Sequence, residues 1–331
     1  MSVKISNPTT IVQSGGGGGS RPTTWADFKA MTLAQMQAVY GVGDRVGLAC
    51  PLNNTASQDL LWEIAGFGTT KLSGDATDYP CVTLVARLYP GSTLSFDAAE
   101  TPTAATEETA QAGIYYFGFD GTNYAALSLN EGDTIPYSDY TAVYKTDVTN
   151  NVTYYNQIRQ SGYNNYHFSA ARQWLNSDGA AGAWWNASHV GDVAPTQATQ
   201  LAGFMAGLPT DFKAILSRTE VKSVGNTVTD SGATYTDYDY FFLPSFYEIY
   251  AANTPVEGDR MPYFAVDGSA KNGLRARGAV GGGDTSTWWA RSCYQGNAYG
   301  VYYIYSNGYA GNSNASTAYY LLPACKIILA S

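Results

Sequence analysis

Histidine, serine and acidic residues are the side chains through which this 331-residue chain could act on a substrate. Only two histidines occur, His167 and His189, so a histidine-rich metal site cannot be assembled. A Ser-His-Asp triad would have to use one of them, but no Gly-x-Ser-x-Gly turn presents a serine nucleophile. The 27 acidic residues contain no pair that the sequence singles out for glycoside hydrolysis. We therefore expect each histidine to be a surface or hydrogen-bonding residue.

The cysteines and one acidic cluster are the remaining candidates for metal binding. Cys50, Cys81, Cys293 and Cys325 are widely spaced and lack the Cys-x-x-Cys spacing of zinc sites. Buried free thiols are favoured, and bridges joining the first two and the last two cysteines are the alternative.

The acidic cluster contains Asp230, Asp237 and Asp239, which offer alternating oxygen ligands for calcium. It lacks the glycine and the terminal glutamate of an EF-hand loop, so a solvated loop is favoured. Gly281 to Gly283 precede no Lys-Ser or Lys-Thr pair and indicate a mobile turn, not a phosphate loop. The sequence thus predicts no catalytic residue, no metal and no cofactor.

A segment near the C-terminus has a composition suited to binding. Tyrosine, asparagine, serine and glycine are enriched in antibody paratopes, because tyrosine gives a large rigid contact area and the others adapt their hydrogen bonds. The alternative is a tyrosine-rich hairpin packed as core, but its polar members would then be buried without partners. The candidate ligand-binding residues are Tyr294, Asn297, Tyr299, Tyr302, Tyr305, Tyr309, Asn312, Ser313, Asn314, Ser316, Thr317 and Tyr319.

Composition narrows the class of protein. Only 14% of residues are charged, with 18 basic and 27 acidic residues giving a net charge of −9, and no basic run occurs. Nucleic-acid binding through phosphate neutralisation is therefore not expected. No apolar stretch approaches the roughly 20 residues of a membrane helix, and no signal-peptide pattern is present, so we expect a protein made in the cytoplasm without membrane insertion.

The chain divides into three parts. Residues 1–20 end in a glycine run and predict a flexible tail. Residues 21–43 predict two short helices, because Thr24 and Thr32 can each begin a capping box. Their apolar stripe is expected to dock onto the main domain or onto a neighbouring subunit. Residues 44–331 form the main domain.

Within the main domain, residues 44–150 read as a β-rich part and the middle of the chain as helical. Asp120-Gly121 predicts a hairpin turn. After Gly278 the pattern returns to glycine-broken strands. The predicted strands cover residues 45–50, 60–67, 81–88, 113–119, 123–129 and 326–329. The predicted helices begin at Ser169, Thr196, Thr210 and Ser245.

Several spaced motifs carry a resemblance to a known family. They lie within Tyr166–Trp185, Tyr240–Glu248, Trp288–Ser292 and Pro323–Cys325. The first contains Ser169, Ala170, Arg172, Gln173, Trp174, Leu175, Asn176 and Ser177, followed by Gly182, Ala183, Trp184 and Trp185. Together they resemble variable proteins of diversity-generating retroelements, over residues 150–331 well and over residues 44–150 loosely. Large aromatic and aliphatic residues at these motif positions are expected to be buried, namely Trp174, Leu175, Trp184, Trp288 and Trp289.

The resemblance implies an α+β, C-type lectin-like domain of the formylglycine-generating-enzyme type. In such proteins a reverse transcriptase that misreads template adenines diversifies codons near the C-terminus, commonly asparagine codons. It implies a variable region over residues 286–322, and Asn, Tyr, Ser, Thr and Gly are all reachable from an asparagine codon through its adenines. Formylglycine-generating enzymes use a copper-binding cysteine pair, whereas here only Cys293 lies near the displayed surface.

The sequence thus predicts a lectin-like domain with a β-rich insertion and a flexible, helical N-terminal segment. Its expected function is ligand recognition by a phage or prophage virion protein that binds a host-surface protein or glycan. The N-terminal segment would contact other virion subunits, and a homo-oligomer is an open alternative. The other functions considered are a virion decoration protein without diversification and, as the weakest, a metal-dependent oxidase on the same scaffold.

Overall fold

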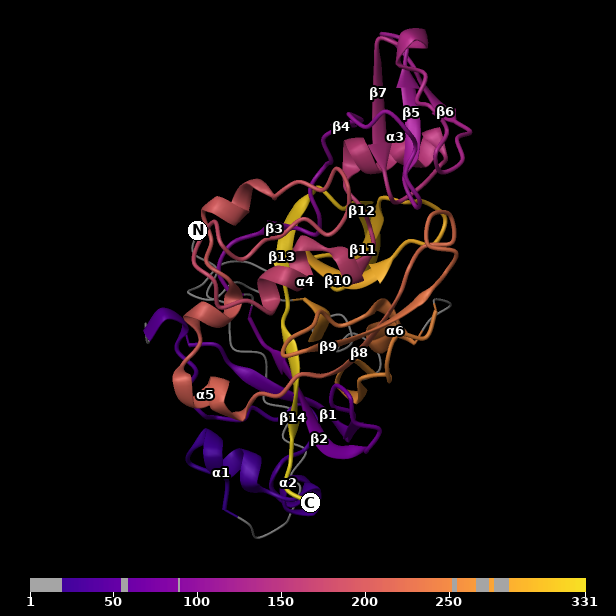
Figure 1. Cartoon of the computed structure of the whole chain (residues 1–331). Coiled ribbons are helices and arrows are strands. Elements are labelled where there is room, and N and C mark those ends of the chain that lie inside the picture. The colour runs from indigo at the N-terminus through magenta and orange to yellow at the C-terminus, as the bar shows by residue number, and fades with distance from the viewer. Residues whose placement is uncertain (1–19, 55–58, 89, 252–254, 266–273, 277–285) are drawn as a thin grey trace.

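The computed structural model describes residues 20–54, 59–88, 90–251, 255–265, 274–276 and 286–331, and its fold is mixed α+β with more sheet than helix (Figure 1). The expected tail over residues 1–20 and the glycine turn at 281–283 lie almost wholly outside these ranges. The α-helices are α1 (Trp25–Ala30), α2 (Leu33–Val39), α3 (Val152–Ser161), α4 (Ala170–Leu175), α5 (Thr210–Ile215) and α6 (Phe246–Tyr250). Short 3-10 helices are η1 (Leu52–Asn54), η3 (Tyr137–Asp139), η4 (Tyr166–Phe168), η5 (Thr196–Thr199), η6 (Phe204–Gly207) and η7 (Pro262–Ala265).

Within the described ranges, the strands form four sheets. A five-stranded sheet has the order β12 (Ala310–Asn314), β11 (Gly300–Ile304), β10 (Trp288–Cys293), β13 (Ala318–Leu321), β3 (Leu94–Ser95). A three-stranded sheet has the order β1 (Trp62–Thr70), β2 (Tyr79–Ala86), β14 (Ala324–Ile328). A four-stranded sheet has the order β4 (Thr103–Ala104), β7 (Ala142–Thr146), β5 (Tyr115–Phe119), β6 (Tyr124–Leu127), and β8 (Thr219–Val224) pairs with β9 (Thr234–Asp239).

The five-stranded sheet is covered by side chains on both faces. Adjacent residues on a strand point to opposite faces. Trp289 accordingly packs against Phe96 and Tyr319, whereas Trp288 stacks on Phe264, and both tryptophans are buried. The expected burial of Trp174, Leu175, Trp184, Trp288 and Trp289 is confirmed.

Residues 44–150 are β-rich as expected, since they contain β1 to β7, but these strands do not form one insertion. β2 pairs with β14 and β3 pairs with β13, so strands from this part complete sheets made by the C-terminus. β4 to β7 form a sheet of their own, which projects at one end of the molecule together with α3 (Figure 1). Phe117 of this lobe stacks on Tyr155 of α3 with ring centroids 4.3 Å apart. The local pattern located the strands but not their partners, because pairing between strands far apart in sequence depends on side-chain packing.

The predictions of helix caps and of a turn are confirmed, whereas several predicted bounds of strands and helices are wrong. Thr32, Ser169 and Ser245 cap their helices as expected, and the turn at Asp120 joins β5 to β6. The strand expected over 45–50 is wrong, because a single isolated bridge, at Arg45, forms in this range. The helix expected from Thr196 is broken into η5 and η6.

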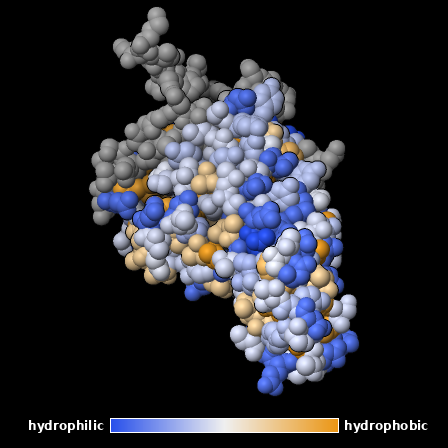
Figure 2. Space-filling model, turned by 90° about the horizontal axis from the view of Figure 1, so that it is seen from above, coloured by the Kyte–Doolittle hydropathy of each residue, from blue (hydrophilic) through white to orange (hydrophobic). Residues whose placement is uncertain are grey.

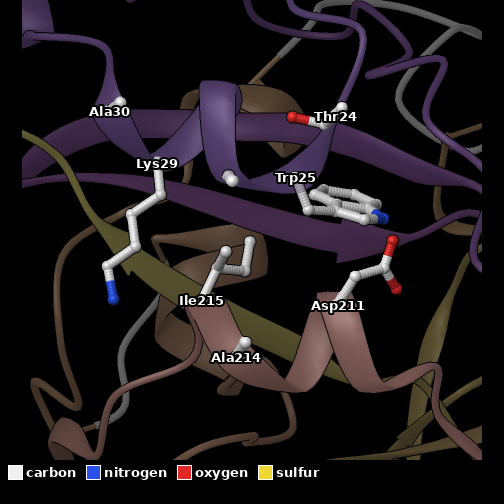
Figure 3. Close-up of a pocket in the computed structure, with 8 residues that line it drawn as sticks. Thr24, Trp25, Lys29, Ala30, Asp211, Ala214 and Ile215 are labelled. Carbon is white, nitrogen blue, oxygen red and sulfur yellow. The ribbon is translucent and has the colours of Figure 1, made fainter.

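The N-terminal helices dock onto the main domain, which was one of the two expected outcomes. Trp25 is buried, lies 4.5 Å from the Phe212 ring, and donates its indole N–H to the Ala49 carbonyl. α1 and α5 face each other across a cavity of about 630 Å³, with Trp25 and Ile215 between them (Figure 3). Residues 24–40 are therefore part of the folded domain.

A buried arginine connects the five-stranded sheet to α6 and to neighbouring backbone segments. Arg291 of β10 forms a two-pronged ion pair with Glu248 of α6, with Nη1 2.6 Å and Nη2 2.9 Å from its carboxylate oxygens. Its other donors bond to the backbone oxygens of Lys222, Leu243 and Glu257. All five guanidinium N–H groups are thus used, as burial of this side chain requires.

Replacing Trp174 with alanine should destabilise the protein by about 3 to 5 kcal/mol, because a large buried ring leaves a cavity. The ring packs on Phe204, and its N–H donates to the Ala202 carbonyl at 2.8 Å. Chemical denaturation measures the change. Tyr309→Ala, at a residue that is 60% exposed, is the control and should change stability by less than about 1 kcal/mol. Equal effects of the two variants would contradict the burial argument.

Candidate ligand-binding surface

A hairpin at the edge of the five-stranded sheet carries six of the twelve predicted binding residues. β11 pairs with β12 in antiparallel register, with Tyr302 opposite Asn312 and Gly300 opposite Asn314. β12 is the edge strand. The turn is closed by the Tyr305 N–H donating to the Tyr309 carbonyl at 2.7 Å.

The turn of the hairpin is fixed to the scaffold. Gly308 has a positive φ of 84°, which glycine adopts without steric cost. The Asn307 side chain accepts from the Tyr309 N–H, and the Tyr250 hydroxyl donates to the Gly308 carbonyl at 2.6 Å. The exposed tip is therefore held in one conformation from two sides.

The twelve predicted residues do not form one face. Tyr302 and Asn312 share one face of the hairpin, and Ser313 lies on the other with Val301. The residues that point most to solvent are at the tip and the outer edge. Tyr309 is 60% and Tyr305 44% exposed, and Tyr294, Asn312 and Asn314 are also exposed.

Three of the predicted residues serve the fold. Tyr302 stacks on Phe246 of α6 at 4.4 Å, and Tyr319 packs on Trp289 at 4.7 Å. Asn297 accepts hydrogen bonds from the N–H groups of Tyr299 and Gly300, so its side chain builds the turn before β11. An asparagine that forms a turn and one that is displayed have the same composition signature, which is why the sequence could not separate them.

A buried polar network supports the loop before β11. Asn164 is fully buried and donates to the carbonyls of Tyr294, Asn297 and Gly300. Its own carbonyl accepts from Asn226 at 2.9 Å. The loop is therefore attached to the scaffold through its backbone, which leaves the outward side chains uncommitted.

A polar groove adjoins this surface. It has a volume of about 480 Å³ and lies between α3 and the residues Tyr299 and Asn314. α3 was not predicted. Its signals are the Asn151 N-cap, which accepts from two backbone N–H groups, and the buried pair Tyr155 and Ile158 three residues apart.

The surface carries no charge of its own. Residues 294–320 include no Asp, Glu, Lys or Arg. Burial, followed by its hydrogen bond to Tyr305, raises the pKa of Tyr303, and burial raises that of Tyr302. These hydroxyls remain neutral at physiological pH. Seen from above, most of the described surface is hydrophilic or neutral in hydropathy (Figure 2).

The prediction that the acidic cluster lies in a solvated loop is wrong. Asp237 and Asp239 are buried, and Arg172 of α4 forks onto Asp239 with Nε and Nη2 at 2.8 and 2.9 Å. Asp230 accepts from Asn165 and Asn226. The carboxylates thus pair with protein donors, and in the described ranges no three His, Cys, Asp or Glu side chains are arranged to hold a metal ion.

The histidines and cysteines occupy packed positions. His167 bonds to Asp237 at 2.8 Å, so the expected hydrogen-bonding role is confirmed for it. All four thiols are free and buried, as favoured over the two bridges. Burial raises the pKa of Cys293 well above its ordinary value, and its sulfur lies 3.1 Å from the Val224 carbonyl, so this thiol is neutral.

His189 lies in a buried cluster with three carboxyl groups. Its Nε2 is 2.5 Å from Glu100, and Asp97 and Asp192 are close enough to affect its charge. The neighbouring Val190 N–H donates to Asp147 at 2.9 Å. Residues 97–101 lead into the β4–β7 lobe, and Asp147 follows the lobe. The cluster therefore connects the segment that enters the lobe to the segment that leaves it.

None of the helices in the described part of the chain has the length and apolar composition that a membrane span requires. The fold and this surface define an α+β protein that displays an uncharged, tyrosine- and asparagine-rich edge hairpin. The family described as "Domain of unknown function (DUF6273)" matches residues 138–329, more than half of the chain, and the chain belongs to this family. No curated protein and no solved structure matches the chain.

The cluster around His189 predicts a fall in stability at alkaline pH. Burial favours neutral imidazole, but the Glu100 hydrogen bond and the charges of Glu100, Asp97 and Asp192 outweigh it and raise the His189 pKa to about 9. The folded state then binds this proton more tightly than the unfolded chain, whose histidine pKa is about 6.5. The contribution is fully present below pH 6.5 and is lost as the pH rises to about 9, by on the order of 3 kcal/mol.

NMR titration can test this prediction directly. Because the chain has two histidines, His167→Gln leaves a single imidazole signal, which belongs to His189. That signal should titrate near pH 9, and urea denaturation of the same variant should show stability falling between pH 6.5 and 9. A midpoint between pH 6 and 7 would show that the carboxyl groups do not stabilise the imidazolium.

Proposed function

We propose that this protein is a ligand-recognition protein of a phage or prophage, of the receptor-binding or adhesin type, with a diversified C-terminal binding surface on a lectin-like scaffold. It binds a protein or glycan on the host surface and is a virion component. Residues 1–43 are the proposed contact with other virion subunits. It does so without catalysis.

One observation carries the proposal: displayed and structural side chains alternate within one short hairpin. Tyr305, Tyr309, Asn312 and Asn314 point to solvent, and the backbone beneath them is held by Tyr250 and Asn164. Surface substitutions away from packed features usually change stability by less than about 0.5 kcal/mol. Such a hairpin can change its outer residues and keep its shape, which is what a diversified surface needs.

The chemistry of the exposed residues supports recognition. Tyrosine rings bury large area with few rotatable bonds, and asparagine both donates and accepts hydrogen bonds. Because the segment has no charged residue, affinity should come from contact area and hydrogen bonds, not from long-range attraction.

Two matched libraries test the proposal. The first randomises Tyr305, Tyr309, Asn312 and Asn314 to the residues reachable from an asparagine codon through its adenines. The second randomises Asn297, Tyr302, Tyr303 and Tyr319 in the same way. Thermal unfolding should show that most clones of the first library melt within a few degrees of the parent, whereas most of the second lose several kcal/mol of stability, because aromatic packing is removed.

Equal damage in both libraries would show that the hairpin is core and would contradict display. Sequencing the DNA around the gene provides the second test. An adenine-substituted repeat of the 3′ end beside a reverse-transcriptase gene is expected. A single copy of this segment without such a gene would remove diversification from the proposal and favour a decoration protein.

A further inference from the structure

The groove beside the hairpin has one wall from α3 and the other from the edge of the sheet. Helix residues Val152, Thr153, Asn156, Gln157, Gln160 and Ser161 form the first wall. Tyr299 and Asn314 form the second. Thr153, Asn156 or Gln157, and Gln160 recur three or four residues apart, which places them on one face of α3.

Two hydrogen bonds fix the width of the groove. The Ser316 N–H donates to the Ser161 carbonyl at 2.8 Å, and the Ala298 N–H donates to the Gln157 side chain at 3.3 Å. The buried residues Tyr155 and Ile158 hold the opposite face of α3 against the protein. The groove is therefore formed before any ligand binds, which lowers the entropic cost of binding.

The lining is rich in unused hydrogen-bonding groups. Seven of its eight residues carry an uncharged amide or hydroxyl. Among the residues that the structure describes, the side chains of Gln160, Asn314 and Tyr299 have no hydrogen-bond partner. The Asn156 carbonyl accepts from Arg159, which leaves its N–H₂ group free to donate.

This lining selects against charged ligands. Phosphate, sulfate and carboxylate groups are recognised by arginine, lysine or helix N-termini, and cations are recognised by carboxylates. None of the eight lining residues is charged. Peptide anchors need apolar pockets that exclude water, and Val152 is the only aliphatic side chain here.

We propose that this groove binds an uncharged saccharide. Side-chain amides present a donor and an acceptor side by side, which matches the neighbouring hydroxyl groups of a sugar ring. The Tyr299 ring supplies an apolar face for the C–H side of the sugar, and its hydroxyl adds a polar contact. The volume of about 480 Å³ is within the range of small-molecule sites.

The inference rests on the proposed function for its second wall. Tyr299 and Asn314 belong to the segment proposed to vary, whereas Asn156 and Gln160 lie outside it. The helix wall would then hold the sugar class constant, and the hairpin wall would select among sugars. Groove and tip can be tested separately, because Tyr305 and Tyr309 do not line the groove.

The test is binding of the full chain to an array of neutral and acidic oligosaccharides, followed by calorimetric titration of each hit. The double variant Asn156→Ala with Gln160→Ala should weaken binding of a neutral glycan at least tenfold. Gln200→Ala, which removes an exposed glutamine that follows η5, is the matched control and should bind as the parent does. Circular dichroism should confirm that all variants fold.

Each outcome decides the inference. Loss of neutral-glycan binding in the double variant alone supports it. Absence of neutral hits, binding of acidic glycans only, or affinity unchanged in the double variant overturns it. Groove-dependent capture of peptides from a random peptide library also overturns it and leaves ligand recognition standing. Failure of the proposed function is seen elsewhere, in an equal loss of stability in the two libraries described above.

Discussion

The buried Arg291 guanidinium constrains how the rest of the structure is arranged. An arginine in this position is tolerated only if every N–H finds an acceptor, and it uses a carboxylate and three backbone oxygens to do so. These acceptors come from β8, from the chain before α6, from α6 and from residue 257. Removing the Glu248 carboxylate, or displacing any of the three backbone oxygens, would leave a buried charge partly unpaired. The charge therefore orients four segments around β10, the middle strand of the sheet that carries the hairpin.

Side-chain packing decreases from β10 toward the edge of the sheet. β10 pairs with β11 and β13, β11 pairs with β12, and β12 has no further neighbour among the described strands. Tyr302 on β11 still packs on Phe246, whereas Asn312 opposite it is exposed. An edge strand normally risks pairing with another chain. Here Gly308 and the Tyr250 hydrogen bond fix the turn that leads into this edge strand.

The sequence predicted those parts of the structure that depend on neighbouring residues. Capping at Thr32, Ser169 and Ser245 needs partners only three residues away, and the Asp120 turn is equally local. It failed where partners are distant: the pairing of β2 with β14, and the forks of Arg172 onto Asp239, span sequence separations that no short pattern records. For the site, composition identified the hairpin. It could not separate displayed Tyr309 from packed Tyr319, since both are tyrosines in the same segment.

The helix wall of the groove, α3, has no sequence pattern that marks it as part of a site. Its outer face is polar but uncharged. Such a face has no characteristic sequence motif, because glutamine and asparagine also occur on helix surfaces that bind nothing. The position of this face in the fold is what makes it a candidate site. The Ser161 carbonyl and the Gln157 side chain accept hydrogen bonds that hold the face at a fixed distance from Tyr299 and Asn314. Amides spread over a surface would each keep a full hydration shell. Gathered across one groove, they present donors and acceptors that match the hydroxyl groups of the proposed sugar, so the cost of removing water from them is offset by equivalent hydrogen bonds.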